Sequence, residues 1–278
     1  MTSPGFAVRE WLFSRLEKKM PKFAANLTML FNELPFLDRF EAASLAGFRG
    51  VEYVSPYEYP PAEIAERLSA HDLTQVLFNL PAGDWAAGER GIAVLPERRE
   101  EFRAGVARAI TYADALHCPQ VNCLAGIAPN GADPNMLREI FVENLRYASD
   151  ALGRAGIRLL VEPINTRDMP GFFLNTSRQA LEIIAAVASD NLFLQYDVYH
   201  MQIMEGDLAA TLARNIGRIK HVQIADNPGR HEPGTGEIDY SSIIAHLDRL
   251  GYDGWIGAEY KPATTTLEGL GWMTRLSG

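Results

Sequence analysis

Cysteine is scarce in this chain, which has only Cys118 and Cys123 among its 278 residues. Two cysteines are too few for the disulfide framework of a small secreted protein. Thiols in so small a number suit a reducing compartment, and burial as inert side chains is the simplest interpretation of both. We therefore expect a cytoplasmic protein with one large domain and a substantial apolar core.

An excess of positive charge is also missing, because 26 lysines and arginines face 35 aspartates and glutamates, for a net charge of −9. A nucleic-acid-binding protein would need a basic face. No apolar run reaches the roughly 18 residues of a membrane span. We therefore expect a small-molecule substrate as partner, with no nucleic acid and no membrane. An anionic substrate would have to be held by locally placed cations.

The first residues lack the apolar central region and the small-residue cleavage site of a secretory signal. Residues 10–19 combine apolar and charged side chains in a way that a short amphipathic helix would use. We expect residues 1–19 to be an N-terminal extension, either disordered or helical. Residues 20–278 are then expected to form the catalytic domain.

A glycine-rich phosphate-binding turn is absent after the first expected strand, where the sequence runs Asn-Leu-Thr-Met-Leu from Asn26 to Leu30. This absence argues against a doubly wound open sheet. From Phe23 onward, strand-like and helix-like segments alternate through eight cycles, as in parallel strands joined by helical crossovers. Eight cycles in about 250 residues are typical of a TIM barrel. We therefore predict an α/β fold, a single (β/α)8 barrel.

The expected elements follow from apolar runs and from proline and glycine at helix ends. The expected strands are Phe23–Leu30, Gly50–Pro56, Thr74–Leu80, Gln120–Gly126, Ile157–Glu162, Leu192–Asp197, Ile219–Asp226 and Trp255–Glu259. The expected helices are Pro35–Gly47, Pro61–His71, Glu97–Leu116, Pro134–Gly156, Ser177–Ala188, Leu208–Ile219, Tyr240–Gly251 and Thr266–Leu276.

Oxygen donors stand at or near the ends of the last four expected strands, namely Glu162, Asp197, Gln223 and Glu259. In a barrel the carboxyl ends of all strands meet at one mouth. Carboxylates that converge there without a cation would repel one another. Any one of these residues could simply bond to loop backbone, but four consecutive strands make coincidence a poor explanation. We predict a divalent metal, Mg²⁺ or Mn²⁺, because all four ligands are oxygen donors.

Further charged side chains are expected near this mouth as substrate-binding groups. His200 follows Asp197 by three positions, although a lone histidine is more often structural. Arg230 lies in a turn-rich loop and could hold a carboxylate through its two-pronged guanidinium, unless it is a plain surface arginine. Lys261 could supply a second positive charge, and a long loop could close Glu89 and Arg90 over the site.

Seven motifs together resemble the hydroxypyruvate isomerase family, a branch of the xylose-isomerase-like barrel superfamily. They cover the chain from about residue 21 to its end, and are Phe23–Phe31, Leu80–Gly91, Val161–Asn165, Gln195–Met201, His221–Asp226, Glu232–Glu237 and Gly257–Pro262. The resemblance implies the interconversion of hydroxypyruvate and 2-hydroxy-3-oxopropanoate (tartronate semialdehyde) in glyoxylate metabolism. It also implies that Glu162 and Glu259 are the acid–base pair as well as metal ligands, with Asp197 and Gln223 completing the shell. Related ketose epimerases usually have a histidine in place of Gln223.

The expected reaction is a metal-assisted proton transfer from C3 to C2 through an enediolate. Three classes of alternative are considered at this stage. A 2-oxo-tetronate isomerase or a ketose 3-epimerase could use the same scaffold, and a metal-dependent phosphodiesterase would need more histidines and a basic surface. A non-catalytic sugar-acid binding protein is the most distant alternative. By analogy with other barrels, the protein could also form a homo-oligomer.

Overall fold

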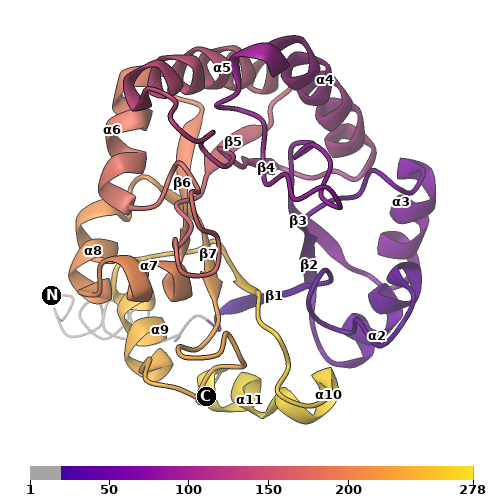
Figure 1. Cartoon of the computed structure of the whole chain (residues 1–278). Helices are drawn as coiled ribbons and strands as arrows, with labels where there is room; N and C mark the ends of the chain where they lie inside the picture. Colours follow the sequence, from indigo (N-terminus) through magenta and orange to yellow (C-terminus); the bar gives the residue numbers. More distant parts are fainter. Residues whose placement is uncertain (1–19, 278) are drawn as a thin grey trace, which may run out of the picture.

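Eight parallel strands close into a single barrel in the computed structural model, which describes residues 20–277 (Figure 1). Each strand pairs with its neighbours in sequence, and β1 closes the barrel against β8. The predicted (β/α)8 barrel is therefore confirmed. The predicted extension at residues 1–19 lies outside the described residues. The strands are β1 Lys22–Asn26, β2 Gly50–Tyr53, β3 Thr74–Asn79, β4 Gln120–Cys123, β5 Arg158–Val161, β6 Leu192–Asp197, β7 Ile219–Ile224 and β8 Trp255–Ala258.

The helices form an outer ring around the barrel (Figure 1). Two short 3-10 helices, η1 (Phe36–Asp38) and η2 (Pro96–Arg98), lead into α2 and α4. None of the helices within the described residues has the length and apolar character needed to cross a bilayer. The α-helices are α2 Arg39–Leu45, α3 Pro61–Ala70, α4 Arg99–Ala115, α5 Pro134–Arg154, α6 Ser177–Val187, α7 Val198–Met204, α8 Leu208–Asn215, α9 Tyr240–Arg249, α10 Thr266–Gly269 and α11 Gly271–Ser277.

Helix α5 shows how the sequence specifies this ring. It begins where the Asp133 side chain accepts a hydrogen bond from the Asn135 N–H, with Pro134 at the first helical position. It ends before Gly156, whose φ of 74° is a left-handed conformation that glycine adopts without strain. Its apolar residues recur every three or four positions and so form one buried face, which includes Leu137, Phe141, Leu145, Ala148 and Leu152.

The interior of the barrel combines a small apolar cluster with polar groups toward its mouth. A small cluster that includes Ala24 and Leu160 is separate from the main core. Asn26 and Glu162 lie two positions later on the same strands or just beyond them, so their side chains point to the same inner face. Barrel interiors are usually filled by branched apolar residues. Here polar groups replace the apolar filling near the mouth, which positions the site described below.

The first strand is shorter than predicted, since β1 ends at Asn26 and not at Leu30. The Asn26 side chain accepts a hydrogen bond from the Thr28 N–H, and its carbonyl accepts from the Leu30 N–H. Both bonds turn the chain directly after the strand. Strand β4 likewise ends at Cys123, short of the predicted Gly126.

A short helix was not predicted directly after β6. The Asp197 carboxylate accepts hydrogen bonds from the N–H groups of Tyr199 and His200, and so caps α7. His200 therefore lies in the first turn of a helix, where a loop was expected. The predicted helix Thr266–Leu276 is also divided, because α10 ends at Gly269 and α11 begins at Gly271.

Candidate active site

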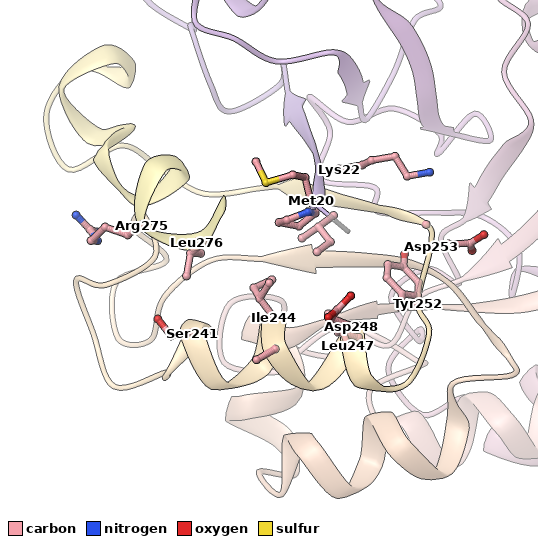
Figure 2. A pocket seen from close by; sticks show the side chains of 14 residues that line it. Met20, Lys22, Ser241, Ile244, Leu247, Asp248, Tyr252, Asp253, Arg275 and Leu276 are labelled. Atoms are coloured by element: carbon pink, nitrogen blue, oxygen red, sulfur yellow. The ribbon is translucent and has the colours of Figure 1, made fainter. Parts of the chain in front are cut away.

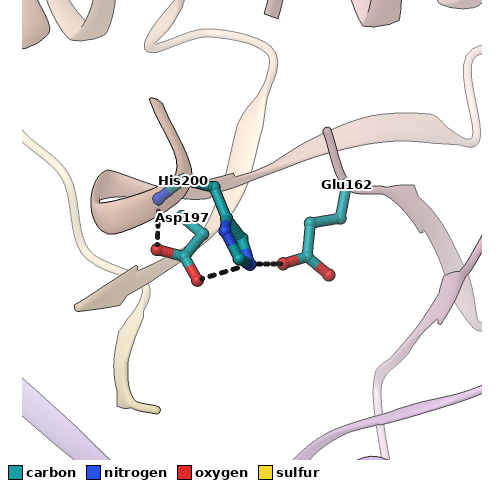
Figure 3. Close-up of side chains that lie close together, drawn as sticks. All are labelled: Glu162, Asp197 and His200. Atoms are coloured by element: carbon teal, nitrogen blue, oxygen red, sulfur yellow. Dashed lines mark hydrogen bonds and ion pairs between the residues drawn. The ribbon is translucent and has the colours of Figure 1, made fainter. Parts of the chain in front are cut away.

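Three carboxylates from three strand ends lie close together at the mouth of the barrel. Glu162 follows β5, Asp197 ends β6 and Glu259 follows β8, and all are buried. His200 from α7 lies between two of them, with its Nε2 atom 3.6 Å from Asp197 Oδ2 and 3.9 Å from Glu162 Oε1 (Figure 3). The guanidinium of Arg230 lies 3.4 Å from Glu259 Oε2 and 3.9 Å from Asp197 Oδ2.

Burial makes the ionised form of these carboxyl groups costly. It is the main cause that raises the pKa of Glu162 well above its usual range, and the negative charges of Glu259 and Asp197 add to the effect. Burial likewise raises the pKa of Asp197 to about 6 and that of Glu259 to about 8, although the nearby Arg230 opposes both shifts. The single positive charge of Arg230 therefore does not neutralise the negative charge that the three carboxyl groups would carry when ionised.

The donor set fits a divalent cation. Ligand atoms of Glu162, Asp197 and His200 all lie within 4.8 Å of one another, so this group could hold a metal ion. The Oδ2 atom of Asp197 is buried without a hydrogen-bond partner. A buried acceptor of this kind is costly unless something positive binds it. Burial also lowers the pKa of His200 well below its usual value, with Arg230 as a second cause, so its imidazole is neutral.

Gln223, the fourth predicted ligand, lies beside Asp197 because the two residues are paired in the register of β6 and β7. Its side-chain amide is bound from both sides. Its Nε2 donates to Glu52 Oε1 at 2.7 Å, and its Oε1 accepts from Gln195 Nε2 at 2.6 Å. An amide oxygen has two lone pairs, so one remains available for a ligand in the mouth.

A buried network around Glu52 supports Gln223 from below, and sequence reasoning missed it. Glu52 on β2 also accepts a hydrogen bond from Asn26 Nδ2 at 3.1 Å, and His221 Nε2 lies 2.6 Å from its second oxygen. Both Glu52 and His221 are fully buried. The available signal was a charged residue within the otherwise apolar second strand, but nothing in the sequence indicated its partners.

Arg230 is held in place by its loop. Its backbone has a φ of 59°, a left-handed conformation that is unusual for a residue other than glycine. The Arg230 N–H donates to the Asp226 carbonyl, and the Arg230 carbonyl accepts from the Lys261 N–H at 2.7 Å. Asp226 is buried and its carboxylate accepts from the N–H groups of Gly234 and Ile238. These bonds direct the guanidinium into the mouth.

Three further predicted residues are placed apart from the carboxylates. Lys261 has an exposed side chain, and its carbonyl contacts His231 Nδ1. The Glu89 carboxylate forms a salt bridge with Arg98 and accepts from the Asp84 N–H. Arg90 stacks on the ring of Trp85 at 3.9 Å from the ring centroid. The contacts of Glu89 and Arg90 order the long loop after β3 and do not join it to the cluster.

Two of the cavities within residues 20–277 bear on the position of the site. One of about 630 Å³ lies at the mouth, over the ends of the first three strands, and Thr28, Ser55 and Trp85 are among its lining residues. The other, of about 110 Å³, lies between α9 and the start of β1, and Ile244 and Tyr252 are among its lining residues (Figure 2). Only the first is at the end of the barrel where the carboxylates lie, so the second is not part of the candidate site.

The sequence profile described as xylose isomerase-like TIM barrel matches residues 40–276. The chain belongs to this family. Within it, the chain is 54% identical to the hydroxypyruvate isomerase of Escherichia coli (strain K12), over 91% of this chain and 98% of that protein. It is 50% identical to the 2-oxo-tetronate isomerase of Cupriavidus necator, with the same coverage. The predicted resemblance to hydroxypyruvate isomerases is therefore confirmed.

A solved structure in the same fold is close to this chain. The crystal structure of a protein titled AP endonuclease, family 2, from Brucella melitensis has a TM-score of 0.91 and 47% sequence identity. The match covers 93% of this chain and all of the other. An L-ribulose 3-epimerase at 23% identity has a TM-score of 0.72 and shares the fold.

The first prediction concerns Gly257, whose missing side chain leaves room for Glu52. A Cβ atom at this position would lie 2.4 Å from both Glu52 carboxylate oxygens. Gly257→Ala should displace Glu52 from Gln223 and lower the free energy of unfolding by about 1–3 kcal/mol. Chemical denaturation measures this, and Gly217→Ala, where a Cβ meets nothing within 4 Å, is the matched control. Equal stabilities for the two variants would contradict the proposed packing.

The second prediction concerns the metal-free protein. The folded pKa of Glu259, about 8, lies above the ordinary value of 4.5, so the folded state holds a proton that the unfolded state releases. Stability should then fall as pH rises from 7 to 8, by at most about 1.4 kcal/mol per pH unit for each such group. This window lies above the ordinary histidine pKa of about 6.5, where protonation of the unfolded chain's histidines has the opposite effect on stability. Thermal denaturation with chelator present measures the effect, and Glu259→Gln should reduce it. A stability that rises over this interval would argue against the raised pKa values.

Proposed function

We propose that the chain is an isomerase that interconverts hydroxypyruvate and 2-hydroxy-3-oxopropanoate. The observation that carries the proposal is the pair Glu162 and Glu259, two buried carboxyl groups with raised pKa values in the same cluster as Asp197. A carboxyl group with a raised pKa can hold a proton and pass it on, as general acid–base catalysis requires. The relative from E. coli, which carries the name hydroxypyruvate isomerase, supports the choice of substrate.

A divalent cation, Mg²⁺ or Mn²⁺, would be held by Glu162, Asp197, Glu259 and the free lone pair of Gln223. When bound, it supplies positive charge that polarises the substrate carbonyl and stabilises an enediolate. The prevalence of oxygen donors supports these hard cations over zinc.

The chain's own residues perform the proton transfer. Moving the carbonyl by one carbon requires the removal of a proton from C3 and the return of one to C2, while the hydroxyl proton passes from the C3 oxygen to the C2 oxygen. One of the two glutamates takes the first proton and the other delivers the second. Each such transfer contributes roughly 10²–10⁴-fold to the rate. The raised pKa values of both groups in the metal-free protein favour this role, because a carboxyl group with a raised pKa can hold a proton as well as release it.

Arg230 is the proposed partner of the substrate carboxylate. Its guanidinium is largely buried beside Glu259 and Asp197, and a guanidinium binds a carboxylate through two parallel hydrogen bonds. His200 is proposed to face a substrate oxygen. We also propose outer substrate contacts for Lys261, Glu89 and Arg90. In that role their side chains would have to move from the positions described above.

A 2-oxo-tetronate is the second candidate substrate. The relative named 2-oxo-tetronate isomerase is almost as similar to this chain as the one named hydroxypyruvate isomerase, at 50% against 54% identity. The cavity of about 630 Å³ at the mouth would accommodate the additional carbon of a tetronate. Turnover of both substrates, followed by NMR, distinguishes them. If hydroxypyruvate is the substrate, we also propose that the enzyme acts in cytoplasmic glyoxylate metabolism. That part of the proposal does not extend to a 2-oxo-tetronate.

The third prediction tests the acid–base pair. Glu162→Gln and Glu259→Gln should each lower kcat by at least about 10²-fold, since an amide cannot exchange the proton. Circular dichroism should show the barrel still folded. Glu182→Gln on the exposed surface of α6 is the matched control and should retain full turnover. Near-normal kcat in either site variant would remove that glutamate from the reaction.

The fourth prediction distinguishes proton transfer from a hydride shift. If Glu162 and Glu259 carry protons that exchange with water, turnover in deuterium oxide should place deuterium on C2 of the aldehyde product. Proton NMR of the product measures the incorporation. A product that contains no solvent deuterium would indicate direct hydride transfer between the two carbons.

A further inference from the structure

The side-chain amide of Asn165 is fully buried and all of its hydrogen-bonding atoms have partners. Its Oδ1 accepts from the backbone N–H of Arg167 at 3.0 Å and from that of Asp168 at 2.8 Å. Its Nδ2 lies 3.2 Å from Asp168 Oδ2 and 2.7 Å from His200 Nδ1. The Tyr199 hydroxyl donates to the same Asp168 oxygen at 2.7 Å, which holds that carboxylate in place.

These partners determine which way the amide points. A backbone N–H can only donate, so two of them require an oxygen at Oδ1. Asp168 is a carboxylate and accepts, so it requires the NH₂ group at Nδ2. A reversed amide would place NH₂ against two donors and an oxygen against a carboxylate. The orientation of Asn165 therefore follows from its neighbours without any assumption about His200.

The orientation of Asn165 determines the proton on His200. In a neutral imidazole one ring nitrogen donates and the other accepts. Because the Asn165 NH₂ group faces Nδ1 at 2.7 Å, Nδ1 is the acceptor and Nε2 carries the proton. Asp197 Oδ2 and Glu162 Oε1 lie 3.6 Å and 3.9 Å from Nε2, which is longer than a hydrogen bond. The Arg230 guanidinium, which can only donate, lies 3.4 Å from Nε2, so the assignment depends on the much shorter Asn165 contact at Nδ1, 2.7 Å long.

We propose that Asn165 is a positioning residue that keeps His200 in the Nε2–H tautomer, so that His200 donates a hydrogen bond into the site and does not ligate the metal. Coordination through Nε2 would require the proton to move to Nδ1, where it would meet the Asn165 NH₂ group. The tautomer follows from the contacts alone. The role of the Nε2–H group as a donor to a substrate oxygen rests on the proposed function.

The tautomer is tested by ¹⁵N-histidine labelling and long-range proton–nitrogen NMR at pH 8. In the metal-free and the Mg²⁺-loaded protein, His200 should show a protonated Nε2 and an unprotonated Nδ1. Asn165→Asp replaces the donor by an acceptor of the same shape and should move the proton to Nδ1. Asn175→Asp makes the same exchange elsewhere in the β5–α6 loop and should leave His200 unchanged.

Metal preference gives a second readout that does not depend on turnover. In Asn165→Asp, a freed Nε2 can join the ligands, and nitrogen ligands favour Zn²⁺. The ratio of Zn²⁺ to Mg²⁺ affinity, measured by competition titration, should rise by about tenfold or more. Asn175→Asp should leave that ratio unchanged.

Two results would overturn the inference. One is a protonated Nδ1 on His200 in the unmodified protein, which tests the tautomer even if Asn165→Asp does not fold. The other is an Asn165→Asp variant with an unaltered tautomer and an unaltered metal preference. A confirmed tautomer in a protein that does not turn over hydroxypyruvate would contradict the proposed function and leave the tautomer standing.

Discussion

The structure depends on an electrostatic imbalance at the mouth of the barrel. Glu162, Asp197 and Glu259 are buried together, and Arg230 is the one guanidinium described beside them. Burial raises the pKa of each carboxyl group and nearby negative charges add to the effect, so the cluster is stable only when it binds protons or a cation. A cluster in that state can hold a dication and exchange protons with a small substrate.

The residues around the cluster restrict the conformations that its side chains can adopt. Glu52 holds one end of the Gln223 amide, and Asn165 faces the Nδ1 atom of His200. Gly257 provides the space that the Glu52 carboxylate occupies. Buried polar groups of this kind are favourable only when their hydrogen bonds are made, which fixes a single arrangement of the side chains. The site is therefore preorganised by contacts that lie one layer away from the proposed chemistry.

The sequence predicts the barrel and the strand-end oxygen donors well, because both depend on local patterns. Alternating apolar segments give the eight cycles, and the carboxyl ends of barrel strands meet by geometry alone. The supporting contacts are less accessible, because they join distant positions. Glu52 and Gln223 are 171 residues apart, and no local pattern relates them. Helix α7 was missed for a different reason, since Asp197 serves both as its N-cap and as a member of the cluster.

The presence of a dication among the three carboxylates is tested most directly by anomalous diffraction from crystals grown with Mn²⁺. The account predicts one manganese peak within bonding distance of Glu162, Asp197 and Glu259, with His200 Nε2 outside the coordination shell. A peak bonded to His200, or no peak among these carboxylates at saturating Mn²⁺, would contradict it.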